Sequence, residues 1–241
     1  MKASESDQRS ILDIQKFDQQ SATLKNKAAT LPELAEITST TIKQNNVRDL
    51  RIAAETELSD VKRELARAEG DVEQIVTRIE RDEKRLASGT GTPKELEQTQ
   101  HELGTLGVRR SELEEVELEI MMRVDGIKDR ISALTTEENE LALVIANLNI
   151  RKENALAAIH TELEGIETDR KATTQSVSAE LLALYEKIRE SSGIGAAALA
   201  GNQCKGCNLT MNTIELQRIS GLAEDEVVRC EECRCILVRD K

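Results

Sequence analysis

Apolar side chains recur every third or fourth residue along most of the chain before residue 193. The earliest series consists of Ile14, Phe17, Ser21, Leu24, Ala28 and Leu31. Alternating steps of three and four residues predict a heptad seam, along which one helix packs against another. Pro32 ends this series, and because proline interrupts helical hydrogen bonding we expect a kink or short break at residues 31–32.

The pattern resumes from Leu34 to Leu86 and again from Leu96 to Ile188, on either side of the stretch ASGTGTPKEL. Two glycines in this stretch permit a bend. Thr92 can then cap a new helix that has Pro93 at its first position and Glu95 at its third, which is a capping box. The sequence therefore predicts two antiparallel helical arms, of about residues 4–88 and 93–191, joined by a turn at residues 87–93.

The composition is typical of a coiled coil, since 32% of the residues are charged and there is no Trp, one Phe and one Tyr. The net charge of −12 disfavours binding to nucleic acid or to an anionic membrane unless positive charge is locally concentrated. No apolar run approaches the ~20 residues that span a bilayer. The first ten residues, MKASESDQRS, lack the apolar core of a signal peptide. We therefore expect a cytoplasmic protein without a membrane partner.

The cysteines provide the clearest chemical signal. Cys204 and Cys207 form one C-x2-C pair, and Cys230 and Cys233 form a second after a gap of 22 residues. This spacing predicts a closed four-thiolate site for one structural Zn²⁺, with Gly206 allowing the tight turn of the first pair. Two disulfides or a redox-active pair are the alternative, which a reducing cytoplasm disfavours. The fifth thiol, Cys235, is spare in this scheme, although it could substitute for Cys233.

Three short β-prone runs surround the cysteines, at residues 209–213, 226–229 and 236–239. Short strands that carry two cysteine pairs form a zinc ribbon, which depends on its metal to fold. The predicted fold class is mainly α: a long antiparallel two-helix coiled-coil hairpin over residues 1–192, followed by a small β zinc ribbon over residues 193–241. The pattern leaves open whether the ribbon packs near Tyr185 or swings about residues 193–201.

Three stretches together carry a family resemblance: ILDIQKFD, TPKELEQTQHEL, and the paired motifs CKGC and CEECRCILV. They resemble the bacterial C4-type zinc-ribbon proteins with an N-terminal coiled-coil hairpin. The resemblance implies zinc binding by the four paired cysteines, no established catalytic activity, and a regulatory adaptor or nucleic-acid-binding role, some members being linked to RNA or to a transcription sigma factor. The chain departs from the family where glycine and then arginine usually follow the last ligand, since Arg234 and Cys235 stand there.

Two functional hypotheses follow. The favoured one is a non-catalytic adaptor that binds partner proteins through the hairpin, the ribbon or both, with homo-oligomerisation through the seam left open. The sequence does not name the partner, and the family resemblance implies one related to transcription or RNA. The alternative is nucleic-acid binding through basic residues of the ribbon, which are Lys205, Arg218, Arg229, Arg234, Arg239 and Lys241. Seven acidic residues offset these six from residue 201 onward, and no aromatic ring is present there to stack on a base. His101 and His160 lie far apart without a nucleophile pattern, so we expect no enzyme activity.

Overall fold

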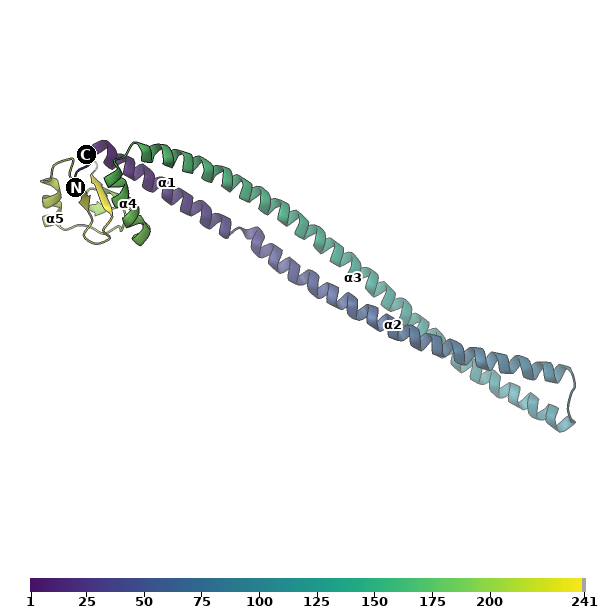
Figure 1. The fold of residues 1–241 in the computed structure, drawn as a ribbon. Helices are drawn as coiled ribbons and strands as arrows, with labels where there is room; N and C mark the ends of the chain where they lie inside the picture. Colours follow the sequence, from purple (N-terminus) through teal and green to yellow (C-terminus); the bar gives the residue numbers. More distant parts are fainter. Residues whose placement is uncertain (240–241) are drawn as a thin grey trace. The chain divides into compact units, whose positions relative to one another are not determined.

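The computed structural model describes residues 1–239, and its ribbon is drawn in Figure 1. The helices are α1 (Glu5–Ala29), α2 (Pro32–Ala87), α3 (Pro93–Gln175), α4 (Ala179–Ser192) and α5 (Thr213–Ser220). The strands are β1 (Ala196–Ala200), β2 (Gln203–Cys204), β3 (Val228–Arg229) and β4 (Ile236–Arg239). The predicted fold class, a helical hairpin with a small C-terminal strand region, is confirmed. None of the described helices is long and apolar enough to cross a membrane.

The chain divides into two compact units, one formed by residues 35–149 and the other by Met1–Leu34 with the chain from Ile150 onward. The second of these joins both helical ends to the C-terminal module, by which we mean residues 193–239. This division follows contacts within the chain, whereas the domains 1–192 and 193–241 were drawn from sequence pattern and stay a prediction.

The break and the turn occur where the sequence predicts them. Helix α1 ends at Ala29 and α2 begins at Pro32. At the turn, the Thr92 N–H donates to Glu95 Oε2 at 2.7 Å, and the Glu95 N–H donates to Thr92 Oγ1 at 3.4 Å. This capping box is reciprocal, and the hydrogen bond from the Thr92 backbone lowers the pKa of Glu95. Gly89 and Gly91 supply positive φ angles of 62° and 146° in the bend.

The second arm is not the single helix expected over residues 93–191. It is interrupted at residues 176–178, between α3 and α4. The local sequence TTQSVS is rich in serine and threonine, which favour caps and turns over a helix interior. The carboxylate of Asp7, on α1, accepts the Ser178 N–H at 3.0 Å and so satisfies a donor at the start of α4. Hydrogen bonding from Ser4 is the main cause that lowers the pKa of Asp7.

Within residues 35–149, α2 and α3 bury the predicted seam. Its core consists of Ala54, Val61, Ala68, Ile120, Val124 and Ile127. The three residues from α2 are seven positions apart, as a heptad requires. Ion pairs from helix to helix flank this core, including Arg51 with Glu138 at 2.8 Å and Arg123 with Glu64 at 3.0 Å.

In the other unit, the sheet has the order β2-β1-β4-β3, with β1 and β4 parallel and the remaining pairs antiparallel. Helices α1 and α4 lie beside it (Figure 1). Successive side chains of β4 point to opposite faces. Ile236 packs with Ile11 and Tyr185 of these helices, whereas Leu237 packs with the cysteines and α5. The module therefore packs near Tyr185, which decides between the two arrangements left open by the sequence.

Two features of the module differ from the sequence-based expectation. Residues 193–201 are not a free connector, because they contain β1, a central strand of the sheet. Residues 209–213 are not a strand: Thr210 makes one isolated bridge with Gln203, and α5 already begins at Thr213. The alanine-rich sequence of β1 did not predict a strand, since alanine is depleted in strands.

Gly195, the residue before β1, lies directly against Tyr185 of α4. A Cβ atom at this position would stand 2.5 Å from two ring atoms of Tyr185 and 2.9 Å from its carbonyl oxygen. Tyr185 is completely buried in the same core as Ile11, Leu181 and Ile236, so a movement of its ring would disturb this packing. A side chain at residue 195 would therefore push the sheet away from the helices.

We expect Gly195→Ala to destabilise the protein by about 1–3 kcal/mol, because the added methyl group overpacks a filled core. Gly165→Ala provides the matched control, since a Cβ there meets nothing within 4 Å. That change should stabilise α3 by about 0.5–1 kcal/mol, because alanine is the better helix former. Chemical denaturation followed by circular dichroism measures both, and equal effects of the two variants would contradict the packing argument.

Candidate metal centre

Four cysteine sulfurs converge in the C-terminal module. Cys204 is the last residue of β2, Cys230 directly follows β3, and the other two close the respective turns. The sulfurs of Cys204, Cys207, Cys230 and Cys233 all lie within 4.8 Å of one another. The Cys204–Cys233 and Cys207–Cys230 sulfur distances are both 3.9 Å. Four sulfurs bound to one tetrahedral ion at ~2.3 Å stand ~3.8 Å apart, so this cluster could hold a metal ion.

The two cysteine pairs share one backbone conformation, in which the residue after the pair has a positive φ angle and hydrogen-bonds to the first cysteine. After the first pair, Asn208 has φ 62° and its N–H donates to the Cys204 carbonyl at 2.8 Å. After the second pair, Arg234 has φ 66° and its N–H donates to the Cys230 carbonyl at 3.0 Å. Both residues occupy the left-handed region, which asparagine tolerates and arginine rarely adopts. The tight geometry is thus set by the residue that follows each pair.

Gly206 has a different role from the one expected. It is not among the residues with positive φ, so it does not supply the turn. A Cβ at Gly206 would lie 3.1 Å from the Cβ of Ala197 and 3.3 Å from the sulfur of Cys235. The residue is small because the first cysteine pair packs directly against β1.

The surroundings of the cluster favour a bound cation. All five cysteines are free thiols, and Cys204 and Cys230 are buried while Cys207 and Cys233 are half-buried. Burial raises the pKa of Cys233 to about 11, and it also raises the pKa of Cys235. Four thiolates cannot accumulate in such a place without a compensating positive charge, which a bound metal ion supplies while displacing the thiol protons.

Several of the basic residues proposed for nucleic-acid binding make hydrogen bonds within the module. The Lys205 ammonium donates to Gln203 Oε1 at 2.7 Å, and Arg229 Nε donates to the Arg234 carbonyl at 3.0 Å. Arg218 pairs with Glu215 at 2.7 Å, and this hydrogen bond raises the pKa of Arg218. Lys241 lies outside the described residues. Nucleic-acid binding by this set stays a prediction.

The half-buried side chain of Arg239 is held by contacts within the module. Its guanidinium donates to five backbone carbonyls at 2.7–3.2 Å, those of Ile219, Leu222, Ala223, Glu224 and Glu226. These carbonyls belong to the end of α5 and the loop that follows it. Arg239 therefore holds this loop against β4, a role that its charge alone did not reveal.

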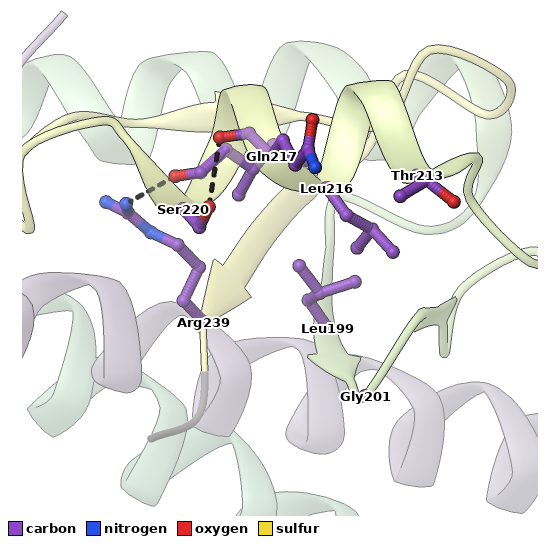
Figure 2. A pocket seen from close by; sticks show the side chains of 8 residues that line it. Leu199, Gly201, Thr213, Leu216, Gln217, Ser220 and Arg239 are labelled. Atoms are coloured by element: carbon purple, nitrogen blue, oxygen red, sulfur yellow. Dashed lines mark hydrogen bonds between the residues drawn. The ribbon is translucent and has the colours of Figure 1, made fainter.

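A groove of about 460 Å³ lies beside Arg239, between α5 and β1. Figure 2 shows its lining, in which Leu199 and Leu216 stand opposite each other, and polar residues such as Gln217 and Ser220 also line it. The hydroxyl of Ser220 donates to the Gln217 carbonyl at 2.9 Å, and no histidine, cysteine or carboxylate lines the groove. The lining therefore offers no arrangement for acid–base or nucleophilic chemistry.

Sequence reasoning missed the residue that links the module to α1. Gln15 is buried, and its Oε1 accepts hydrogen bonds from the backbone N–H groups of Gly195 at 2.7 Å and Ala196 at 3.2 Å. Among the residues that the structure describes, its Nε2 has no hydrogen-bond partner. No signal in the sequence indicated this role, because a polar residue that follows a seam position is ordinary in an amphipathic helix.

A polar network surrounds the same junction. Tyr185 donates its hydroxyl hydrogen to Asp18 at 2.6 Å, and burial is the main cause that raises the pKa of Tyr185. Asp18 also pairs with Arg170 at 2.8 Å and with Arg189 at 3.4 Å. The hydrogen bond to Asp18 is the main cause that raises the pKa of Arg170. Glu186 completes the set by pairing with both arginines.

Comparisons with known proteins agree with this architecture. The sequence model described as the CT398-like coiled coil hairpin domain matches residues 14–193. An uncharacterized protein of Mycobacterium tuberculosis is 34% identical over 243 residues, covering 99% of this chain and 98% of its own length. A solved structure from Mycobacterium smegmatis has a TM-score of 0.87 and 30% identity over all of both chains. CT398 from Chlamydia trachomatis has a TM-score of 0.67 and 18% identity over 96% of this chain and 97% of its own, which shows the fold alone.

Metal removal should unfold the cysteine pairs while leaving the seam of residues 35–149 intact, because binding a structural metal provides folding free energy. Treatment with a strong chelator at neutral pH, followed by hydrogen exchange, measures this. We expect backbone amides at residues 203–209 and 228–236 to lose protection while those around Val61 and Val124 keep it. Unchanged protection at the cysteine pairs, after elemental analysis shows that the metal is gone, would contradict a structural role for it.

Arg234→Gly should stabilise the protein by about 1 kcal/mol, because glycine adopts the left-handed conformation without the steric cost that arginine bears. The two hydrogen bonds of residue 234 use backbone atoms and survive the change. Lys205→Gly is the control, since Lys205 is equally exposed but is not among the residues with positive φ. The denaturant midpoint should rise for Arg234→Gly and should fall or stay level for Lys205→Gly. The reverse order would refute backbone strain at Arg234.

Proposed function

We propose that this chain, which belongs to the CT398-like coiled coil hairpin domain family, is a non-catalytic adaptor that binds a partner protein through its helical hairpin. The proposal includes one structural zinc ion, held by Cys204, Cys207, Cys230 and Cys233, that stabilises the C-terminal module. Its main support is an exposed apolar and acidic surface on α3, described next.

The outward stripe of α3 consists of Val108, Ser111, Glu115, Leu118, Glu119, Met122, Gly126 and Asp129. At 3.6 residues per turn these positions lie on one side of the helix, away from the buried seam residues Ile120, Val124 and Ile127. Three large apolar side chains in it are well exposed: Val108 by 63%, Leu118 by 59% and Met122 by 68%. Apolar side chains repeated along one exposed helix face are typical of an interaction surface.

The charge of the stripe indicates what kind of partner fits it. Glu115, Glu119 and Asp129 fall within the stripe, and no lysine or arginine does. Within the described structure none of these three carboxylates has an ion-pair partner. An amphipathic helix with an apolar face and flanking basic residues would pack its apolar side chains against Leu118 and Met122 and pair its charges with these carboxylates. Methionine adapts its shape readily, which suits binding of such a helix.

Zinc is the proposed ion because four thiolates in a closed tetrahedron are a characteristic structural site for it. A closed shell leaves no position for a substrate, so this site does not support catalysis. His101 and His160 do not support it either. His160 makes a 3.6 Å contact with Glu164 on its own helix, and both histidines are exposed.

The experiment uses the zinc-loaded full-length protein as bait in two portions of one lysate, one treated with nuclease and one left untreated. We expect the wild-type protein to retain a partner protein. The double variant Leu118→Lys/Met122→Lys should retain about tenfold less of this partner, since lysine removes apolar area and repels a basic partner. Lysine is a good helix former, so α3 should keep its helicity, which circular dichroism checks. Bound proteins are quantified by mass spectrometry.

Ile214→Lys on α5 is the matched control, because Ile214 is 80% exposed and belongs to the C-terminal module. It should leave binding unchanged. If Ile214→Lys alone lost the partner, the binding surface would lie on the C-terminal module and not on α3. Disappearance of every partner on nuclease treatment, together with co-purified RNA or DNA, would favour the nucleic-acid hypothesis instead.

A further inference from the structure

Cys235 is the one cysteine outside the four-sulfur cluster, yet it lies beside it. Its side chain is completely buried where the second cysteine pair meets β4. Its sulfur is 3.3 Å from that of Cys233 and 3.8 Å from that of Cys204. The second distance equals the ~3.8 Å that separates two sulfurs bound to the same tetrahedral ion. Cys235 is therefore spaced like a ligand relative to two members of the cluster.

We propose that Cys235 is a reserve ligand, whose sulfur takes the coordination position of Cys233 when the Cys233 sulfur is lost to chemical modification. This inference rests on the metal site of the proposed function. It concerns one position of the shell only, because Cys235 has no sulfur contact with Cys207 or Cys230 in the described structure.

The two sulfurs differ in exposure in the way such an exchange requires. Cys233 is half-buried and lies in a surface turn with exposed neighbours, whereas Cys235 is completely buried. Thiol reagents and oxidants act first on accessible sulfurs. Cys233 is thus the more vulnerable of these two, and Cys235 is the more protected.

The local geometry makes the exchange a small movement. Only Arg234 separates the two cysteines, and the Cys230 N–H donates to the Cys235 carbonyl at 2.9 Å, which keeps this segment beside the other ligands. When an alkylating reagent modifies the Cys233 thiolate, a new S–C bond forms, the leaving group of the reagent departs, and the resulting thioether leaves the ion. The Cys235 sulfur releases its proton to water as it binds the ion in that place. The exchange of ligands transfers no electron and forms no disulfide.

Cobalt(II) titration of the full-length protein tests the proposal, because the absorption of bound cobalt reports how many thiolates surround it. We expect Cys233→Ser to keep a four-thiolate spectrum, with metal affinity within about tenfold of the wild type. The double variant Cys233→Ser/Cys235→Ser should give a three-thiolate spectrum and bind about a hundredfold more weakly than the wild type. Cys235→Ser alone should leave the four-thiolate spectrum in place.

Cys207→Ser is the matched control, since it removes a half-buried ligand that Cys235 does not reach. It should give a three-thiolate spectrum. A three-thiolate spectrum for Cys233→Ser would overturn the reserve role, and so would a loss of one thiolate in Cys235→Ser, which would make Cys235 an ordinary ligand. Failure of the wild type to bind cobalt through thiolates would instead refute the metal site of the proposed function.

A second measurement avoids substitution altogether. The zinc-loaded wild type is treated with limiting iodoacetamide, and native mass spectrometry with peptide mapping relates the labelled residue to the metal content. Molecules labelled at Cys233 should retain their zinc ion, whereas molecules labelled at Cys207 should lose it. Equal loss of zinc from both labelled populations would overturn the proposal, independently of how the serine variants fold.

Discussion

The parallel pairing of β1 with β4 is the contact on which the C-terminal module and its neighbouring helices depend. Both faces of this strand pair are covered, one by α1 and α4 and the other by the cysteines and α5. A shift of one residue in this pairing would exchange the two faces, moving Ile236 toward the sulfurs and Leu237 toward Tyr185. The register therefore couples the geometry of the metal centre to the packing of the helices.

Specific polar contacts hold that register. Gln15 accepts hydrogen bonds from two backbone N–H groups at the start of β1, and the Asp18 network joins Tyr185 to Arg170 and Arg189. Partly buried ion pairs of this kind add little net stability, because desolvation opposes their attraction. Their geometric demands are strict, however, so they favour a single arrangement of α1, α4 and the sheet. Apolar packing supplies the stability in this region and polar contacts select its geometry.

In the proposed function, stability and partner binding are likewise assigned to different parts of the chain. In the proposal the cysteine cluster has a structural role, and Cys235 lies beside it as a replacement for one of its four sulfur ligands. The proposed partner-binding surface is the outward stripe of α3, where Leu118 and Met122 face solvent between carboxylates. Because the seam uses only one side of α3, the opposite side is available for a partner without disturbing the pairing with α2.

The sequence by itself determined the features that depend on residues close together in the chain. Seven-residue spacing placed Ala54, Val61 and Ala68 in the seam, Thr92 and Glu95 specified a cap, and C-x2-C spacing identified the four sulfurs that converge. Only the tertiary structure decided the rest: that residues 196–200 form a central strand, that α3 stops at Gln175, and that Cys235 is buried beside the cluster. These depend on partners far away in the sequence, such as β4 for β1 and Asp7 for Ser178. A local pattern cannot report them, because the free energy that fixes them arises only when distant segments meet.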